Sequence, residues 1–155
     1  WDNDLFDQIM DSLLKKVREF HYTIKGYDKA PSAVLKAKDN IKNANLDEYI
    51  TIEERNFFET EKTTQGKLHI VFNPPYDERL DIHMERFYAS IGDTLKKNYP
   101  GTNAWFITGN LEALKFVGLK PSRKIKLFNA SIEARLVKYE MYEGSKRTKF
   151  QITDK

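Results

Sequence analysis

The spacing of apolar residues along the chain predicts its helices. Apolar side chains recur at every third or fourth position over residues 4–20, which is the period of one face of an α-helix. A second helix is predicted to begin with Pro31 in its first turn, where a missing N–H leaves no helical hydrogen bond unmade. A long third helix ends near Tyr99, before a Pro-Gly pair, and a short fourth helix covers residues 111–117. The residues predicted to face the core are Val34, Ala37 and Ile41 of the second helix and Met84, Phe87, Ile91 and Leu95 of the third.

Short apolar runs rich in β-branched and aromatic residues predict the strands. They cover residues 22–25, 50–54, 68–72, 104–108, 123–128 and 134–141. Residues 129–131 join the last two strands, which we expect to be antiparallel. The order of elements is α-β-α-β-β-α-β-α-β-β. Such alternation is typical of an α/β protein with a mostly parallel sheet and helices on both of its faces.

The composition narrows the class of protein. A chain of 155 residues with 40% hydrophobic residues is long enough for one globular domain with a real core. It contains no cysteine, which excludes disulfides and cysteine-ligated metals and fits a reducing, cytoplasmic compartment. No apolar run approaches the roughly 20 residues that span a bilayer, so we expect no membrane partner. The net charge of +3 is too small to indicate a partner, although basic residues cluster over 120–126 and 146–149.

The segment Asn73-Pro74-Pro75-Tyr76 follows directly after residues 68–72, which have the length and β-branching of a buried strand. The two prolines end the strand because neither can donate a backbone N–H. An amide side chain, two carbonyls and an aromatic ring then lie at the carboxyl end of a strand, where ligands bind in open α/β sheets. A plain Asn-Pro turn is the alternative.

Several segments together resemble a known family. Ile24-Lys25-Gly26-Tyr27-Asp28, Ala37-Lys38-Asp39-Asn40 and Asn73-Pro74-Pro75-Tyr76 resemble successive motifs of class I S-adenosylmethionine-dependent methyltransferases that methylate amino groups. The segment 118–129, followed by Glu133-Ala134-Arg135-Leu136, resembles the end of bacterial THUMP-containing 23S ribosomal RNA guanine-N2 methyltransferases. The resemblance covers nearly the whole chain. It implies a Rossmann-like methyltransferase sheet with a C-terminal antiparallel hairpin, a partial catalytic domain over residues 1–142 and a polar tail over 143–155.

The chain departs from the family pattern in two places. In the family a glycine-rich loop and its strand precede these motifs, yet no glycine occurs before Tyr22. The resemblance therefore implies the C-terminal part of a catalytic domain, lacking the first strand and the THUMP domain. We expect this part alone to be inactive and to have an incomplete S-adenosyl-L-methionine site. Three alternatives account for its exposed sheet edges: it was cut from a longer protein, it self-associates through these edges, or the two strands that flank the missing one pair directly. Asn56 stands where the family usually has an acidic residue, and its amide oxygen can still accept a hydrogen bond.

The resemblance also assigns residues to the cofactor. It places Asp28, Lys29, Asn56 and Phe57 at S-adenosyl-L-methionine. A carboxylate at Asp28 can accept the hydroxyls of a ribose, although a helix-capping aspartate is the alternative. Asn56 and Phe57 would lie beside the adenine, with the amide at its amino edge and the ring against its face.

The resemblance assigns catalysis to Asn73, Pro74, Pro75 and Tyr76. The Asn73 side-chain oxygen and the Pro74 carbonyl would accept hydrogen bonds from the exocyclic amine, and Tyr76 would stack on a base splayed out of its helix. The residues expected to contact phosphates of ribosomal RNA are Arg79, Lys120, Ser122, Arg123 and Lys124, for which a solvated basic face is the alternative. No metal site is expected, because the three histidines are scattered without ligand spacing.

Two other functions stay open from the sequence. One is a non-enzymatic RNA-binding or interaction module with a degenerate methyltransferase fold. The other is a fragment of a DNA adenine-N6 methyltransferase, because Asn-Pro-Pro-Tyr also serves that chemistry.

Overall fold

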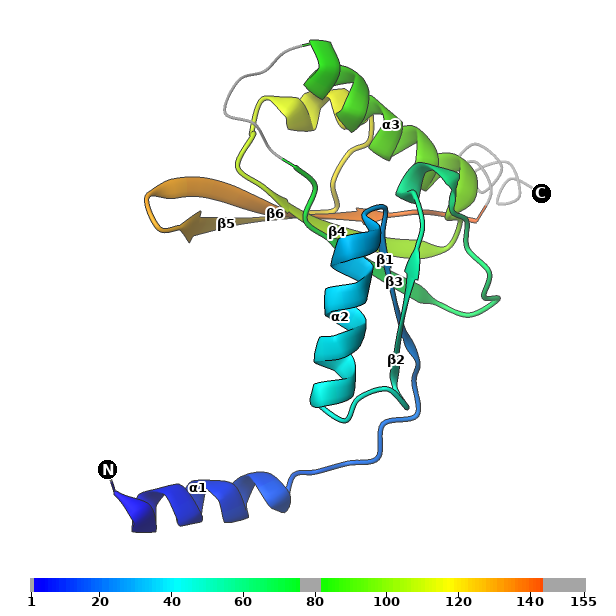
Figure 1. Ribbon diagram of the computed structural model, residues 1–155. Coiled ribbons are helices and arrows are strands. Elements are labelled where there is room, and N and C mark those ends of the chain that lie inside the picture. The colour runs from blue at the N-terminus through cyan, green and yellow to red at the C-terminus, as the bar shows by residue number, and fades with distance from the viewer. Residues whose placement is uncertain (1, 76–81, 144–155) are drawn as a thin grey trace, which may run out of the picture. The chain divides into compact units, whose positions relative to one another are not determined.

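The computed structural model describes residues 2–75 and 82–143 (Figure 1). The predictions made for Tyr76, Arg79 and the tail beyond residue 143 lie outside the described residues. The chain divides into two compact units, residues 1–57 and residues 58–155. Each unit has its own sheet, and each is described by itself.

The first unit is built around a parallel pair of strands. Its elements are α1 (Asn3–Leu14), β1 (Ile24–Asp28), α2 (Pro31–Asn43) and β2 (Ile50–Glu54). β1 and β2 pair in register from Ile24 opposite Ile50 to Asp28 opposite Glu54. α2 begins with Pro31 as predicted and lies along this pair, with Val34 buried (Figure 1).

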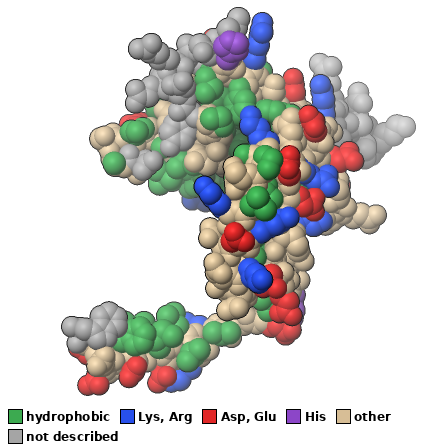
Figure 2. Space-filling view, viewed as in Figure 1, with side chains coloured by type: hydrophobic (Ala, Val, Ile, Leu, Met, Phe, Trp, Pro, Cys, Tyr) green, Lys and Arg blue, Asp and Glu red, His purple; other side chains and the backbone are tan. Residues whose placement is uncertain are grey.

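α1 is shorter than predicted, because it ends at Leu14 rather than near residue 20. None of its residues is buried, so burial of an apolar face does not extend the helix beyond Leu14. Figure 2 shows the apolar side chains of α1 along one side of the helix and acidic side chains along the other. β1 also differs from the prediction, since it begins at Ile24 and continues to Asp28, as far as β2 offers partners.

The second unit contains a mixed sheet. Its strands are β3 (Leu68–Phe72), β4 (Thr102–Thr108), β5 (Arg123–Asn129) and β6 (Ile132–Glu140), in the order β3-β4-β6-β5. β3 and β4 are parallel, while β6 is antiparallel to both β4 and β5. The helix α3 (Ile82–Asn98) and the 3-10 helix η2 (Ala113–Val117) pack together on one face of this sheet (Figure 1). A further 3-10 helix, η1 (Phe57–Glu59), lies between β2 and β3 in the sequence.

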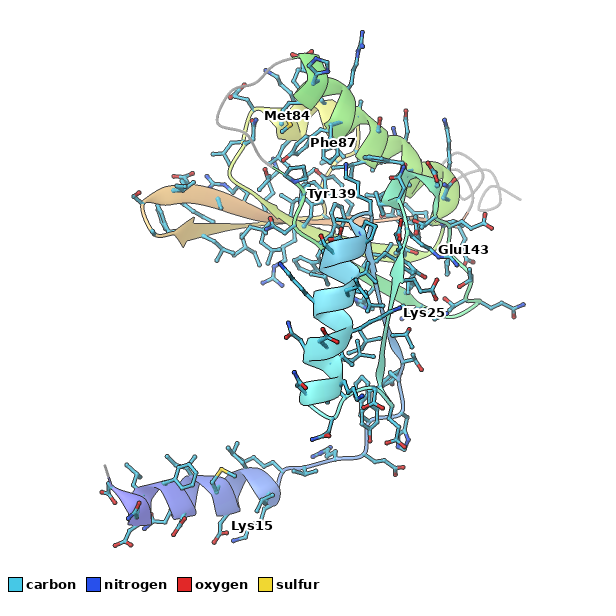
Figure 3. The ribbon with its side chains drawn as sticks, viewed as in Figure 1. Lys15, Lys25, Met84, Phe87, Tyr139 and Glu143 are labelled. Atoms are coloured by element: carbon cyan, nitrogen blue, oxygen red, sulfur yellow. The ribbon has the colours of Figure 1, made fainter. Side chains whose placement is uncertain are left out.

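The core of the second unit lies between α3 and β4. Every second residue of β4, from Thr102 to Thr108, is buried. Ile91 and Leu95 of α3 are buried as predicted, and Met84 and Phe87 are partly buried. The largest fully buried side chains also include Tyr88, Tyr139 and Val137. Figure 3 shows Tyr139 in the layer between the sheet and α3, below Phe87.

The structure corrects the prediction that residues 68–72 form a buried strand. Leu68, Ile70 and Phe72 are partly buried, whereas His69 and Val71 are exposed, Val71 by 76%. Successive side chains of a strand point to opposite faces of the sheet, and in β3 only the face of Leu68, Ile70 and Phe72 is covered. In the described part of the chain β1 pairs only with β2 and β3 only with β4, which leaves β1 and β3 with one unpaired edge each.

The contact between α3 and η2 generates a prediction about Gly92. Alanine normally favours a helix by about 1 kcal/mol over glycine. At Gly92, however, an added Cβ would lie 1.8 Å from the Val117 carbonyl oxygen. We expect Gly92→Ala to lower the free energy of unfolding by about 1–3 kcal/mol, the usual cost of overpacking, as measured by urea denaturation. Gly66→Ala is the matched control, because nothing lies within 4 Å of its Cβ position. Equal stability of the two variants would contradict this packing.

Candidate active site

Asn73, Pro74 and Pro75 leave the sheet at the carboxyl end of β3, as the sequence predicts. The last residue of the strand, Phe72, pairs with Phe106 of β4. Asn73 is exposed, Pro74 is buried and Pro75 is exposed. The amide of Asn73 is therefore open to solvent, while the buried Pro74 fixes the backbone beside it.

A layer of aromatic rings supports this turn from inside the unit. The ring centroid of Phe72 lies 5.0 Å from that of Phe106, which in turn stacks on Tyr139 at 5.6 Å. Tyr88 of α3 meets Phe106 edge to face at 6.3 Å. Ring pairs of this kind contribute about 0.5–1.5 kcal/mol beyond the burial of their area. The end of β3 is thus held by packing as well as by strand pairing.

A polar chain of hydrogen bonds lies at the carboxyl end of the neighbouring strand. The hydroxyl groups of Tyr88 and Thr108 are hydrogen-bonded at 2.5 Å. The Thr108 hydroxyl oxygen also accepts from the Asn110 N–H at 3.0 Å. The Asn110 side-chain oxygen accepts from the Ala113 N–H at 3.0 Å, which fixes the start of η2. All four of these residues are buried.

These two features share one edge of the sheet. β3 and β4 are parallel, so their carboxyl ends lie side by side. Asn73 follows β3 at this edge, and the segment from Thr108 to Asn110 lies at the end of β4.

Sequence reasoning missed Tyr88, Thr108 and Asn110. The signal available for Thr108 and Asn110 was the polar Thr-Gly-Asn segment at the end of an apolar strand, whereas no local pattern indicates Tyr88.

The residues predicted to hold the cofactor lie at the carboxyl edge of the first unit. Asp28 ends β1 and pairs in register with Glu54, the last residue of β2. Asn56 and Phe57 follow β2 by two and three residues and are partly buried. Because β1 and β2 are parallel, the structure brings Asp28 and the segment 56–57 to the same edge of this sheet.

The Asp28 side chain accepts a hydrogen bond within the turn that leads into α2. Its Oδ1 accepts a hydrogen bond from the Ala30 N–H at 2.8 Å, just before α2 begins. The Arg55 N–H donates to the Asp28 backbone carbonyl at 2.9 Å. The side chain is exposed, as is that of Lys29. A carboxylate has about four acceptor sites, so the contact with Ala30 leaves room for further donors.

The predicted RNA-binding residues lie at the start of β5 and just before it. Lys120, Ser122, Arg123 and Lys124 are all exposed. Ser122 donates from its N–H to the Lys138 carbonyl oxygen at 2.8 Å, which ties this segment to β6. Arg123 and Lys124 are neighbours in a strand, so they lie on opposite faces of the sheet. The cluster in the sequence is therefore divided between two surfaces.

The described residues offer neither a metal-binding cluster nor a membrane-spanning helix. In residues 2–75 and 82–143, no group of three or more His, Cys, Asp or Glu side chains could hold a metal ion. No helix in this part of the chain is long and apolar enough to cross a membrane.

Comparison with known proteins identifies the class. The model of the RMKL-like methyltransferase domain family matches residues 5–138. A ribosomal RNA large subunit methyltransferase K/L from Cellvibrio japonicus is 34% identical over 123 residues, which cover 76% of this chain and 16% of the relative. The chain belongs to the RMKL-like methyltransferase domain family. It spans a small part of the length of that relative.

Solved structures agree with this assignment. A methyltransferase in complex with SAH superposes with a TM-score of 0.77 over 94% of this chain and 39% of its own, at 20% identity. This likeness confirms the predicted Rossmann-like methyltransferase fold. A Listeria monocytogenes protein described as a predicted N6-adenine-specific DNA methylase has a TM-score of 0.62 and 26% identity over 76% of this chain and 30% of its own. The comparisons support S-adenosyl-L-methionine as the cofactor that the sequence predicts.

Two buried tyrosines at the site differ in their hydroxyl partners and yield a matched prediction. The Tyr88 hydroxyl is bonded to Thr108, whereas the Tyr139 hydroxyl is buried without a hydrogen-bond partner among the described residues. We expect Tyr88→Phe to lower the free energy of unfolding by about 1 kcal/mol, the usual net contribution of a hydrogen bond. Tyr139→Phe should leave stability unchanged or raise it. Urea denaturation of both variants measures the difference, and a larger loss in Tyr139→Phe would contradict it.

The burial of Tyr139 also gives stability a pH dependence. Burial, with a smaller contribution from Tyr88, raises the pKa of Tyr139 from 10.0 to about 12. The folded state therefore keeps a proton that the unfolded chain loses, so this contribution is complete below pH 10 and declines as pH rises towards 12. We expect the free energy of unfolding to fall more steeply over this interval in the unaltered chain than in Tyr139→Phe. Identical pH slopes would rule out this effect.

Proposed function

We propose that this chain carries the target-amine site of an S-adenosyl-L-methionine-dependent methyltransferase that modifies an exocyclic amino group of ribosomal RNA, namely guanine N2 of 23S rRNA. The observation that carries the proposal is the placement of Asn73-Pro74-Pro75 at the carboxyl edge of β3, in a chain of the RMKL-like methyltransferase domain family. The ribosomal RNA substrate is supported by the name of the Cellvibrio relative.

The proposed mechanism follows from the chemistry of an exocyclic amine. Its nitrogen is a poor nucleophile because the lone pair is delocalised into the base. Hydrogen bonds from its two N–H groups to the Asn73 side-chain oxygen and the Pro74 carbonyl favour a pyramidal nitrogen with an available lone pair. Asn73 is neutral, so it orients the amine, and the proton that the nitrogen loses after it accepts the methyl group passes to solvent. Alignment and charge placement then carry much of the rate enhancement.

The prolines and the aromatic layer keep the acceptors in place. Neither Pro74 nor Pro75 has an N–H, so neither continues the ladder between β3 and β4. The buried Pro74 and the packed Phe72 limit movement of the turn. In this proposal Tyr76 stacks on the base that is delivered to Asn73.

The residues of the first unit fit a nucleoside. The exposed Asp28 carboxylate has acceptor sites for ribose hydroxyls besides the one used by Ala30. Asn56 would meet the adenine amino edge, Phe57 its face, and Lys29 would lie next to Asp28. S-adenosyl-L-methionine supplies a methyl group that its sulfonium already activates. The chain's own task is to hold and orient the nucleoside.

The remaining parts of the proposal concern RNA and assembly. Arg79, Lys120, Ser122, Arg123 and Lys124 would contact phosphates, and such contacts weaken with salt. Residues 1–142 would form the catalytic part and residues 143–155 a polar tail. The unpaired edges of β1 and β3 are surfaces through which copies of the chain could associate.

A second candidate substrate is adenine N6 in DNA. It is favoured by the likeness to the Listeria protein described as a predicted N6-adenine-specific DNA methylase. The same pair of acceptors at Asn73 and Pro74 would serve an adenine amine. Product analysis separates the candidates, because N2-methylguanosine and N6-methyldeoxyadenosine differ in mass.

The proposed role of Asn73 is tested by removing its acceptor oxygen. In the full-length gene product, we expect Asn73→Ala to lower methyl transfer by about 10²- to 10³-fold, the usual effect of losing one well-placed polar group. Cofactor affinity should stay within a few-fold. Methylated nucleosides from ribosomal RNA and from DNA are measured by mass spectrometry.

Asn43→Ala is the control for that experiment, because Asn43 is an exposed residue at the end of α2. It should retain the activity of the unaltered enzyme. Normal turnover by Asn73→Ala would exclude the mechanism, while methylated adenine in DNA alone would replace the RNA substrate.

A further inference from the structure

The β5–β6 hairpin extends beyond the edge of the sheet where Asn73 lies. Thr108, the last residue of β4, pairs with Arg135 of β6. The hairpin continues past this pair to Asn129 opposite Ile132. Three residues at about 3.3 Å each carry it roughly 10 Å beyond the end of β4. Figure 1 shows the hairpin projecting from the sheet. Because β3 and β4 are parallel, Asn73 leaves the sheet at this same edge.

The projecting part of the hairpin exposes an aromatic ring. Phe128 lies opposite Glu133 near the turn and is 65% exposed. Strand residues two apart share a face, so Phe128 lies on the same face as Lys126 and Lys124. The Lys126 ammonium is 5.1 Å from the centroid of the Phe128 ring. The Phe128 ring therefore has a cation close to it and is still exposed to solvent.

The charges around this ring are mainly positive. Arg135 lies opposite Lys126 and therefore on the same face. Glu133 accepts from both, with Nζ of Lys126 at 2.7 Å and Nη1 of Arg135 at 2.6 Å. The hydrogen bonds from Lys126 and Arg135 hold the pKa of Glu133 below its usual range. One carboxylate therefore holds two cations in place, while Lys124 adds a third positive charge on this face.

We propose that the end of this hairpin is an RNA-contacting finger, in which Phe128 stacks on an unpaired base while Lys124, Lys126 and Arg135 face the phosphates. The inference rests on the proposed RNA substrate and adds a recognition element outside the target-amine site. Aromatic rings within a basic surface are how proteins bind single-stranded nucleic acid. The centre of a protein interface, by contrast, is depleted of charge. The position beyond β4 suits a nucleotide next to the one held at Asn73.

The test measures binding of a short, fluorescently labelled, unpaired RNA to this chain by anisotropy, at several salt concentrations. We expect Phe128→Ala to weaken binding about tenfold, because the variant loses the stacking contact with one base, which is strong whatever the base is. Phe128→Trp should retain binding, since it keeps an aromatic face. Lys124→Gln should weaken binding and reduce the slope of log K against log salt by about 0.7.

Ile132→Ala is the matched control, because Ile132 is 44% exposed near the same turn but on the other face of the hairpin. It should bind RNA as the unaltered chain does. Circular dichroism confirms that each variant is folded. Unchanged binding by Phe128→Ala with weakened binding by Lys124→Gln would overturn the stacking role and leave the RNA substrate standing. Equal losses in Phe128→Ala and Phe128→Trp would also overturn it. If the unaltered chain binds no RNA, the finger fails, while the RNA substrate is decided separately by the nucleosides that the full-length gene product methylates.

Discussion

The parallel pairing of β3 with β4 is the constraint on which the second unit depends. Parallel pairing brings two carboxyl ends to one edge, so residues 35 positions apart in the sequence, Asn73 and Thr108, lie at the same side of the sheet. β6 then enters antiparallel to β4, which places the turn of the hairpin at that edge too. The turn of Asn73 to Pro75, the polar Thr108–Asn110 segment and the end of the hairpin are thus brought to one edge by these two strand pairings.

Packing behind this edge makes the arrangement specific. Phe106 contacts rings from three other elements, namely Phe72 of β3, Tyr88 of α3 and Tyr139 of β6. Replacing or shifting any of these rings changes the surroundings of the others, since interiors are close-packed. The Tyr88 hydroxyl links the same aromatic layer to Thr108, and through it to the start of η2. The apolar core and the polar edge are therefore one connected structure.

Much of the fold could be predicted from residue pattern alone. The order of elements, the antiparallel hairpin and the placement of Asn73 and Asp28 at strand ends agree with the structure. The reason is that turn residues such as Pro74 and Gly118 act locally, whatever the rest of the chain does. Gly118 has the positive φ of 64° that ends η2, as its position after an apolar run suggests.

The errors arose where tertiary partners decide the outcome. The periodicity of α1 extends to residue 20, but without buried contacts the helix ends at Leu14. Residues 68–72 resemble a strand covered on both faces, yet the strand lies at a sheet edge and Val71 is exposed. The hydrogen bond of the Tyr88 hydroxyl joins residues far apart in the sequence, and that of the Asn110 side chain depends on the geometry of a loop. Neither can be predicted from a local sequence pattern. The exposure of Phe128 is likewise visible only once the register of the hairpin is known.

The unequal sequence separations within the sheet have a consequence for the order of folding. β5 and β6 are joined by a turn of two residues, so their pairing closes a short loop at little entropic cost. β3 meets β4 only after the intervening crossover and α3 have been arranged. The hairpin is therefore suited to form early and to serve as a template, while the edge that bears Asn73 is completed late. A complete chain that refolds from denaturant is therefore expected to form this hairpin before the turn that bears Asn73.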